Sequence, residues 1–188
     1  MKEYKLPIGC DVPETIILAD GDFPSHPLAL EWLRQCPYVV CCDGAANTYI
    51  RSGRMPEAIV GDGDSLLPGI KERYASLIHS EAEQETNDLS KAFRFCLSQE
   101  RKRITIMGAT GKREDHTIGN VSLLADYMEQ AEVSMMTDYG IFVPIREDSM
   151  FESYIGQQIS VFNMNSTALS AEGLAYPLSV FTNGGKGL

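Results

Sequence analysis

The sequence predicts an α/β N-terminal domain, with a mostly parallel sheet and helices on both faces, followed by a small all-β sandwich domain. Over the first 130 residues, short apolar runs alternate with stretches of helical periodicity, which is typical of parallel strands joined by helices. From Glu132 onward only strand-like runs remain, separated by turn residues. We therefore place the boundary near residue 130 and expect domains over residues 1–130 and 131–188.

In the first part, the strands are the short apolar runs and the helices lie between them. The expected strands are residues 15–19, 38–42, 58–60 and 103–107. The expected helices are residues 25–36, 43–50, 67–77, 86–99 and 116–130. Ser25 is a candidate cap for the first helix, with Pro27 in its first turn.

Two helices have apolar stripes that should face the sheet. The stripe of residues 86–99 consists of Leu89, Ala92, Phe93, Cys96 and Leu97. The stripe of residues 116–130 consists of Ile118, Val121, Leu124, Ala125 and Met128. In the second part, the expected strands are residues 132–138, 140–145, 149–154, 157–163 and 167–181.

The composition limits the classes of partner. The net charge of −10 repels nucleic-acid phosphates, so we expect no nucleic acid partner, whereas cationic ligands and metal ions suit this surface. No apolar run is long enough to span a bilayer, and the N-terminus has no apolar signal core, so we expect no membrane partner. The five cysteines show no Cys-x-x-Cys spacing and are expected to be free thiols in a cytoplasmic protein.

Acidic residues and glycines follow each predicted strand of the first part. In open α/β sheets, ligands bind beyond the carboxyl ends of the strands. The segments at these ends are Asp20-Gly21-Asp22, Asp43-Gly44, Gly61-Asp62-Gly63-Asp64 and residues 108–115. For Asp20 and Asp22 a simple turn is the favoured interpretation, because aspartate and glycine are common turn residues.

Among these segments, the one with Asp62 and Asp64 most resembles a metal site. Residues two apart in an extended segment project to the same side, and two carboxylates held together repel unless a cation lies between them. Mg²⁺ usually takes one or two carboxylates together with substrate phosphates. Taken alone, the segment is equally compatible with a turn and with a metal site.

Asp88 and Lys91 lie one turn apart at the start of the helix over residues 86–99. From spacing alone, Asp88 complements the helix dipole and Lys91 pairs with it. The segment from Gly108 to Asn120 follows a strand and opens a helix, a geometry that binds anions on backbone N–H groups. Here Arg113 can bind phosphate oxygens, and Asp115 can act as a metal ligand or a base.

His116 and Asn120 lie at positions i and i+4 of one helix face. A histidine at a helix start is more often structural than catalytic. Spacing and composition therefore predict a site for Mg²⁺ and phosphate at the edge of an α/β sheet, without identifying the substrate.

Several motifs in order resemble the thiamine pyrophosphokinase family. They are Asp43-Gly-Ala45, Gly61-Asp-Gly-Asp-Ser65, Asn87-Asp-Leu-Ser-Lys-Ala92, Gly108-Ala-Thr-Gly-x-Arg-x-Asp-His116 with Asn120, and Glu172-Gly-Leu-Ala-Tyr-Pro-Leu178. The resemblance implies an α/β catalytic domain that binds Mg²⁺ and ATP, followed by a β-sandwich domain. It also implies a homodimer in which thiamine binds at the subunit interface, between the catalytic domain and the β domain of the partner subunit.

The resemblance also implies roles for single residues. Asp62, Asp64 and Asp88 match the metal-binding aspartates, and Lys91 and Arg113 match residues that hold the phosphates. The residues matching the nucleotide and substrate cleft are Asp43, Asn47, His116 and Asn120. Asp115 matches the aspartate that is the first choice to orient or deprotonate the thiamine hydroxyl, so the catalytic set is Asp62, Asp64, Asp88 and Asp115.

The implied reaction transfers the pyrophosphoryl group of ATP to the hydroxyl of thiamine, giving thiamine diphosphate and AMP. Two departures accompany it. Asn87 stands where the family usually has threonine, and the Ser-Asn-Glu block that follows the Gly-Leu-x-Tyr-Pro-Leu stretch is absent from the sequence. We expect the sequence to lack its C-terminal end. The alternatives are a Mg²⁺-dependent phosphohydrolase and a thiamine- or nucleotide-binding protein without catalysis.

Overall fold

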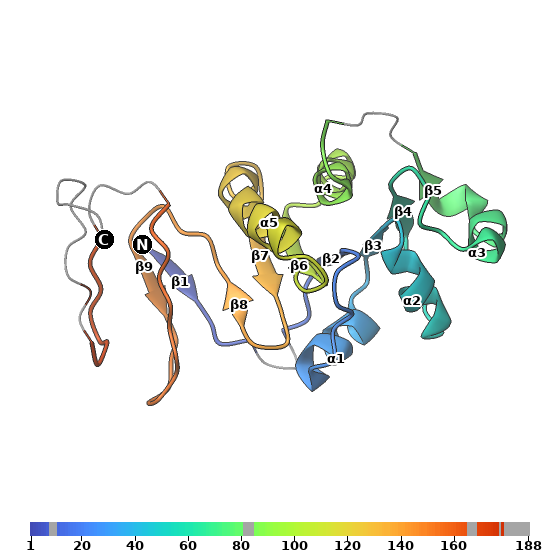
Figure 1. Ribbon diagram of the computed structural model, residues 1–188. Coiled ribbons are helices and arrows are strands. Elements are labelled where there is room, and N and C mark those ends of the chain that lie inside the picture. The colour runs from blue at the N-terminus through green and yellow to red at the C-terminus, as the bar shows by residue number, and fades with distance from the viewer. Residues whose placement is uncertain (8–10, 81–84, 165–168, 177, 179–188) are drawn as a thin grey trace. The chain divides into compact units, whose positions relative to one another are not determined.

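The computed structural model of the chain describes residues 1–7, 11–80, 85–164, 169–176 and 178 (Figure 1). The chain divides into two compact units, Met1–Phe151 and Glu152–Leu188. Two features expected from the sequence, Cys10 and the terminal Gly184-Gly-Lys-Gly187, lie outside the described residues. Much of the expected strand over residues 167–181 does so as well.

A seven-stranded sheet forms the centre of the first unit, with strand order β5-β4-β3-β2-β6-β7-β8. All neighbouring pairs are parallel except β7 and β8, which are antiparallel. The strands are β2 (Thr15–Leu18), β3 (Val39–Cys42), β4 (Ala58–Val60), β5 (Ile78–His79), β6 (Arg103–Met107), β7 (Glu132–Met136) and β8 (Ile141–Phe142). The mostly parallel sheet predicted from the apolar runs is confirmed.

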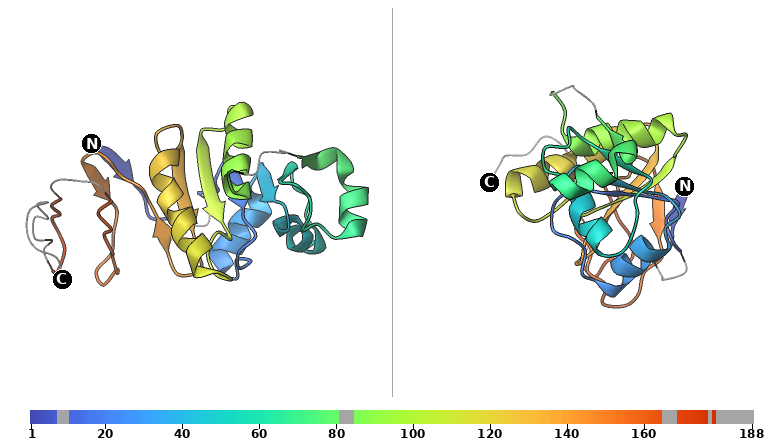
Figure 2. Two further views of the ribbon diagram at one scale, coloured as in Figure 1. Left: turned by 45° about the horizontal axis from the view of Figure 1, so that its top comes forward. Right: turned by 90° about the vertical axis from the view of Figure 1, so that its right-hand side faces the viewer.

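Helices cover both faces of this sheet, as predicted. They are α1 (Pro27–Gln35), α2 (Ala45–Arg51), α3 (Pro68–Arg73), α4 (Asp88–Ser98) and α5 (Glu114–Tyr127), with a 3₁₀ turn, η1 (Ala75–Leu77). The core beneath α4 and α5 contains Ile17, Val40 and Ile106, and the core beneath α1 and α2 contains the alternate residues Ile16, Leu18 and Cys41. Figure 2 shows the two pairs of helices on opposite sides of the sheet.

The N-terminal cap predicted for the first helix is wrong. His26, not Ser25, caps α1, because its Nδ1 atom accepts a hydrogen bond from the Leu28 N–H at 3.2 Å. The Ser25 hydroxyl instead donates to Asp138, which follows β7. In α4, the predicted inward residues Leu89, Ala92, Phe93 and Cys96 are buried.

The prediction for α5 is partly wrong. Leu124 is buried, but Ile118 is 71% exposed. Burial increases toward the C-terminal end of α5, where Leu124 joins the core that also contains Val133 of β7, whereas the first turns are largely exposed. Tyr127, which the stripe did not include, is buried and stacks on Phe93 with ring centroids 3.9 Å apart.

The structure also corrects the strands expected after residue 130. β7 pairs in parallel with β6 over its whole length, so it belongs to the α/β sheet and not to the all-β part. β8 extends the same sheet as its edge strand. β9 (Ser149–Phe151) pairs in parallel with β1 (Lys2–Tyr4), a strand that the sequence did not predict.

The second unit is described over residues 152–164, 169–176 and 178, and no strand is assigned there. The strand expected at residues 157–163 is therefore not found. Apolar alternation identifies a face but supplies no hydrogen-bonded neighbour, and a strand exists only through such pairing. In the parts of the chain that the structure describes, no helix has the length and apolar character needed to cross a membrane.

Candidate functional site

The segments that follow β2, β3, β4 and β6 lie together at the carboxyl edge of the sheet, which we call the rim. The parallel register requires this, because Leu18 lies opposite both Cys41 of β3 and Met107 of β6, and Cys42 lies opposite Val60 of β4. The strand ends that the sequence marked with aspartate and glycine are therefore neighbours in space.

Asp43 lies at the centre of the rim, directly after β3. Its side chain is only 4% exposed, and its backbone adopts a φ of +31°. Its Oδ2 atom accepts a hydrogen bond from the Ser65 N–H at 3.0 Å, whereas its buried Oδ1 atom has no partner among the described residues. Burial raises the pKa of Asp43, and the nearby carboxylates of Asp88 and Asp62 raise it further. This environment favours a bound cation.

Asp62 and Asp64 project from the loop after β4, and both are exposed. The Asp64 N–H donates to the Asp62 Oδ1 atom at 3.0 Å, so the segment forms a turn closed by a side chain. A Cβ atom at Gly61 would lie 2.7 Å from the Asp43 Cβ atom, which shows how closely this loop approaches Asp43. The turn interpretation is correct for the backbone, and both carboxylates remain at the rim.

Asn47, on α2, holds the same loop in place. Its Nδ2 group donates to the Ser65 carbonyl oxygen at 2.8 Å, and its Oδ1 atom accepts from the Leu67 N–H at 2.9 Å. Both ends of the amide are therefore used within the protein. The observed contacts make Asn47 a residue that positions the loop carrying Asp62 and Asp64.

Asp88 and Lys91 reach the rim from the N-terminus of α4. The Cys42 thiol donates to the Asp88 carbonyl oxygen at 3.6 Å, which places this helix end over the end of β3. Asn87 caps the helix by accepting from the Ser90 N–H at 2.9 Å. Lys91 is 4% exposed, and its ammonium lies 3.3 Å from the Asp88 Oδ1 atom. The helix therefore brings a carboxylate and a buried cation to the acidic rim.

The loop from Gly108 to Arg113 connects β6 to α5. Gly108, Gly111 and Lys112 have φ values of +65°, +78° and +57°. The Arg113 Nε group donates to the Asp115 Oδ1 atom at 3.1 Å, and this guanidinium lowers the pKa of Asp115. A carboxylate with a lowered pKa is a weaker base.

His116 and Asn120 differ in how they are used. The His116 N–H donates to the Asp115 Oδ1 atom at 2.9 Å. Asn120 donates to the Ala109 carbonyl oxygen at 2.8 Å and accepts from the Asn87 Nδ2 group at 3.2 Å. Asn120 thus ties the Gly108–Arg113 loop to the cap of α4, a link between distant segments that helical spacing could not predict.

The three carboxylates expected to bind metal do not form a ready-made three-ligand cluster. Among the described residues, no three His, Cys, Asp or Glu side chains are placed to hold a metal ion. The partnerless Asp43 oxygen and the adjacent aspartates instead fit a cation that shares its ligands with a substrate.

The ion pair between Lys112 and Asp20 is a feature of the rim that the sequence reasoning missed. The Lys112 ammonium lies 3.1 Å from the Asp20 Oδ1 atom and 2.8 Å from the Asp20 carbonyl oxygen. The available signals were a lysine within a glycine-containing loop and an aspartate at a neighbouring strand end. Neither indicated the pairing, because it depends on the adjacency of β2 and β6 in the sheet.

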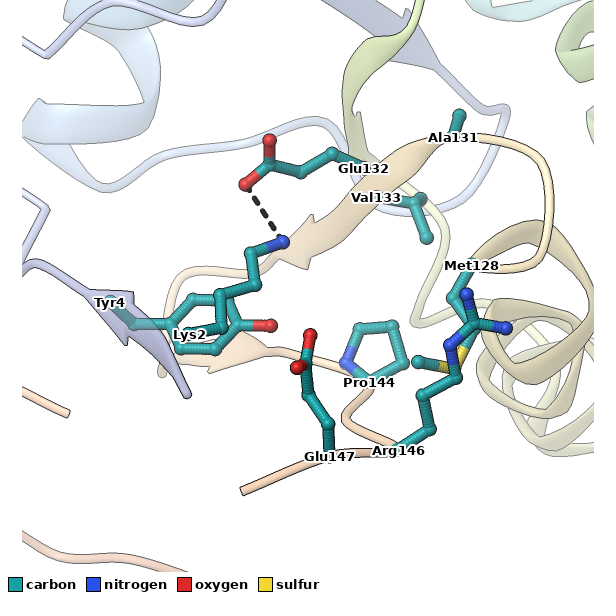
Figure 3. A pocket seen from close by; sticks show the side chains of 9 residues that line it. All are labelled: Lys2, Tyr4, Met128, Ala131, Glu132, Val133, Pro144, Arg146 and Glu147. Atoms are coloured by element: carbon teal, nitrogen blue, oxygen red, sulfur yellow. Dashed lines mark ion pairs between the residues drawn. The ribbon is translucent and has the colours of Figure 1, made fainter. Parts of the chain in front are cut away.

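A cavity of about 110 Å³ lies elsewhere, at the amino end of β7 (Figure 3). Its lining residues are Lys2, Tyr4, Met128, Ala131, Glu132, Val133, Pro144, Arg146 and Glu147. The Lys2 ammonium pairs with Glu132 at 3.2 Å, and Arg146 pairs with Glu129. Both cations of this cavity are thus already neutralised, and it lies at the sheet edge opposite the rim.

Comparisons with known proteins match both parts of the chain. The family model described as thiamin pyrophosphokinase, catalytic domain, matches residues 29–136, and the model of the substrate-binding domain of that enzyme matches residues 140–187. Thiamine pyrophosphokinase 1 of Oryza sativa is 30% identical over 129 residues, which cover 55% of this chain and 49% of the relative. Thiamine pyrophosphokinase of Bacillus subtilis is 34% identical over 86 residues, covering 44% of this chain and 40% of the relative.

Solved structures agree with this result. Thiamin pyrophosphokinase from Geobacillus thermodenitrificans aligns with a TM-score of 0.53 at 27% identity, over 65% of this chain and 58% of that chain. The yeast enzyme, at 18% identity, shares the fold with a TM-score of 0.58, over 72% of this chain and 63% of that chain. The chain spans about half the length of the curated relatives it matches. Because the two family models together match most of its residues, the chain belongs to the thiamin pyrophosphokinase family.

Proposed function

We propose that this protein transfers the pyrophosphoryl group of ATP to the hydroxyl of thiamine, giving thiamine diphosphate and AMP. The observation that supports this most strongly is that the chain matches both the catalytic and the substrate-binding family models, and that aspartates and cations converge at the rim of the catalytic part. In this reaction the thiamine hydroxyl releases its proton to solvent, and its oxygen bonds to the β-phosphorus. The bond from that phosphorus to the bridging α–β oxygen breaks, and AMP leaves with the bridging oxygen.

We assign the metal to the acidic side of the rim. Asp62, Asp64 and Asp88 would hold Mg²⁺ together with phosphate oxygens, and the partnerless oxygen of Asp43 supports a cation there. When bound, Mg²⁺ supplies neutralisation of the charge that develops on the phosphates. Asp43 and Asn47 fix the loop that carries Asp62 and Asp64, through their bonds to Ser65.

Two cationic side chains at the rim would hold the phosphates. Arg113 presents a planar guanidinium, and Lys91 presents an ammonium that is already desolvated before the nucleotide binds. His116 and Asn120 lie on α5, the helix that begins directly after Arg113, and would border the bound phosphates. Pyrophosphoryl transfer depends mostly on positioning and charge neutralisation, which is what this arrangement offers.

We place the thiamine hydroxyl next to Asp115, which would accept its hydrogen bond and orient it. The ion pair with Arg113 supports orientation more than proton removal, because it lowers the pKa of Asp115.

The wider organisation belongs to the same proposal. Residues matched by the second family model would form a β-sandwich that binds thiamine, in a homodimer with the thiamine site at the subunit interface. The first family model ends at residue 136, so the catalytic part would extend through β7, beyond the boundary expected near residue 130. A cytoplasmic location is supported by the free thiols of Cys36, Cys41, Cys42 and Cys96.

The nucleotide product tests the proposal. The protein is incubated with ATP, MgCl₂ and thiamine, and the products are separated by chromatography. We expect AMP and thiamine diphosphate in equal amounts. Formation of ADP would reject pyrophosphoryl transfer. Release of inorganic phosphate without thiamine would instead indicate a phosphohydrolase, and binding without turnover would indicate a protein that has lost catalysis.

A further inference from the structure

The loop after β2 and the loop after β6 are joined along the rim by backbone hydrogen bonds. The Gly21 N–H donates to the Gly108 carbonyl oxygen at 2.6 Å, and the Asp22 N–H donates to the Thr110 carbonyl oxygen at 2.8 Å. A Cβ atom at Gly21 would lie 2.3 Å from that Thr110 oxygen, so only glycine allows this approach. The two loops therefore form one unit as far as Thr110.

Beyond Thr110, the contact between the loops depends on side chains. Lys112 reaches back across the rim, and its ammonium bonds both the carboxylate and the carbonyl oxygen of Asp20. Lys112 adopts a φ of +57°, which is unfavourable for a residue with a side chain and persists only where other contacts stabilise it. The bonds to Asp20 are the side-chain contacts that the structure shows for Lys112 among the described residues.

Asp20 also lies close to the acidic centre of the rim. A Cβ atom at Gly44, the residue next to Asp43, would lie 2.6 Å from the Asp20 Oδ2 atom. Without Lys112, this carboxylate would add a negative charge where the phosphates of a nucleotide must enter. The pair thus performs two tasks, because it neutralises Asp20 and fixes the backbone immediately before Arg113.

We propose that the Asp20–Lys112 ion pair positions Arg113 for the phosphates of ATP and screens them from the Asp20 carboxylate. This inference rests on the proposed function and deepens it. Lys112 occupies an x position of the Gly-x-x-Gly-x-Arg motif, so the resemblance assigns no role to it. Lys112 and Asp20 act through their effect on Arg113 and on the local charge, and are positioning residues.

A double-mutant cycle tests the pair. The variants are Lys112→Met, Asp20→Asn and the combination of both, with Lys112→Arg as the conservative replacement. Lys102→Met is the matched control, because Lys102 lies at the amino edge of the sheet and its ammonium, among the described residues, bonds only the backbone carbonyl oxygen of Gln130, at 3.5 Å. For each variant we measure KM for ATP, kcat, and the Kd for ATP by calorimetry.

We expect Lys112→Met to raise KM and Kd for ATP about fivefold, because the Asp20 carboxylate is no longer screened and Arg113 is less well positioned, and because the pair is about half exposed. The change in kcat should stay below about twofold, because the reacting groups are retained. Lys112→Arg should restore most of the affinity. The effect of Lys112→Met should shrink at least severalfold when Asp20 is already asparagine. An equal cost in both backgrounds would mean that Lys112 binds phosphate directly, and would overturn the proposal.

Amide hydrogen exchange separates this inference from the proposed function. In the nucleotide-free protein, Lys112→Met should speed exchange at the Arg113 amide, which donates to the Gly111 carbonyl oxygen at 2.6 Å, by roughly fivefold, whereas Lys112→Arg and Lys102→Met should not. Unchanged exchange in Lys112→Met would overturn the positioning role even in a fully active enzyme. Faster exchange in a protein that makes no AMP would leave the role of the pair intact and reject only the proposed reaction.

Discussion

Replacing Asp43 by asparagine should make the metal-free protein more stable while impairing its activity. Asp43 is 4% exposed, and one of its oxygens is buried without a partner among the described residues. Its charge is opposed by burial and by the carboxylates of Asp88 and Asp62. An asparagine retains the oxygen that accepts from the Ser65 N–H, and it carries no negative charge beside those carboxylates.

The size of the effect follows from the removal of a buried negative charge whose oxygen has no partner among the described residues, and is about 1–3 kcal/mol. We expect Asp43→Asn to raise the free energy of unfolding by this amount at pH 7 without metal. For a chain of this length, each kcal/mol shifts Tm by roughly 2–4 °C. The expected gain is therefore a rise in Tm of about 3–10 °C.

The pH dependence has a defined sign. The folded pKa of Asp43 lies above its ordinary value of 3.8, so the native state holds this proton more tightly than the unfolded state. Stability is therefore lost as the pH rises from 3.8 through the raised pKa, and the loss is complete above it. The gain from Asp43→Asn should be full at neutral pH and should vanish as the pH falls below 3.8.

The assay is thermal unfolding in EDTA and in MgCl₂ with ATP, over a series of pH values. Asp11→Asn is the matched control, because Asp11 is an exposed carboxylate before β2, outside the rim, and its replacement should change stability by no more than about 0.5 kcal/mol. The stabilisation by Mg²⁺ and ATP should be large in the native protein and small in Asp43→Asn. A lower Tm for Asp43→Asn in EDTA would show that the buried Asp43 carboxylate does not destabilise the metal-free protein.

Three further changes probe the same rim. Asp64→Asn should lower turnover by orders of magnitude with the fold retained, as judged by circular dichroism, and near-normal activity would remove its metal role. Lys91→Met should raise KM for ATP but change the free energy of unfolding by less than about 1.5 kcal/mol, because the partner left behind, Asp88, has a side chain that is 37% exposed and can be hydrated; a large loss of stability in urea titrations would contradict this. Gly108→Ala should destabilise the protein by about 1–3 kcal/mol in the same titrations, because its φ is +65° and a Cβ atom would lie 2.6 Å from the Ala19 carbonyl oxygen; unchanged stability would argue against the close joining of the two loops.

Much of the α/β fold could be predicted because its strands are short apolar runs with acidic ends. The runs around Ile17, Val40 and Ile59 are buried on both faces, which is why they are continuously apolar and easy to recognise. β7, in contrast, was assigned to the all-β part of the chain. Its strand pattern was recognised, but a strand sequence does not specify its partner, and only the structure shows that β7 pairs with β6.

The charged residues of the site could be predicted from the sequence, but the hydrogen bonds that connect its segments could not. The rule that ligands bind at strand ends was enough to gather Asp43, Asp62 and Asp64 at one edge. The bonds of Asn47 to Ser65 and Leu67, and those of Asn120 to Ala109 and Asn87, join segments that are distant in sequence. Because such bonds depend on strand order and loop geometry, spacing within one helix could not reveal them.

The central claim is that the two terminal phosphates of ATP move as one unit to thiamine at this rim. The most direct measurement uses ATP labelled with radioactive phosphorus in the γ-phosphate, incubated with thiamine and MgCl₂. We predict that the label appears in thiamine diphosphate, with one unlabelled AMP formed for each. Label in inorganic phosphate or in thiamine monophosphate, with ADP as the nucleotide product, would contradict the account.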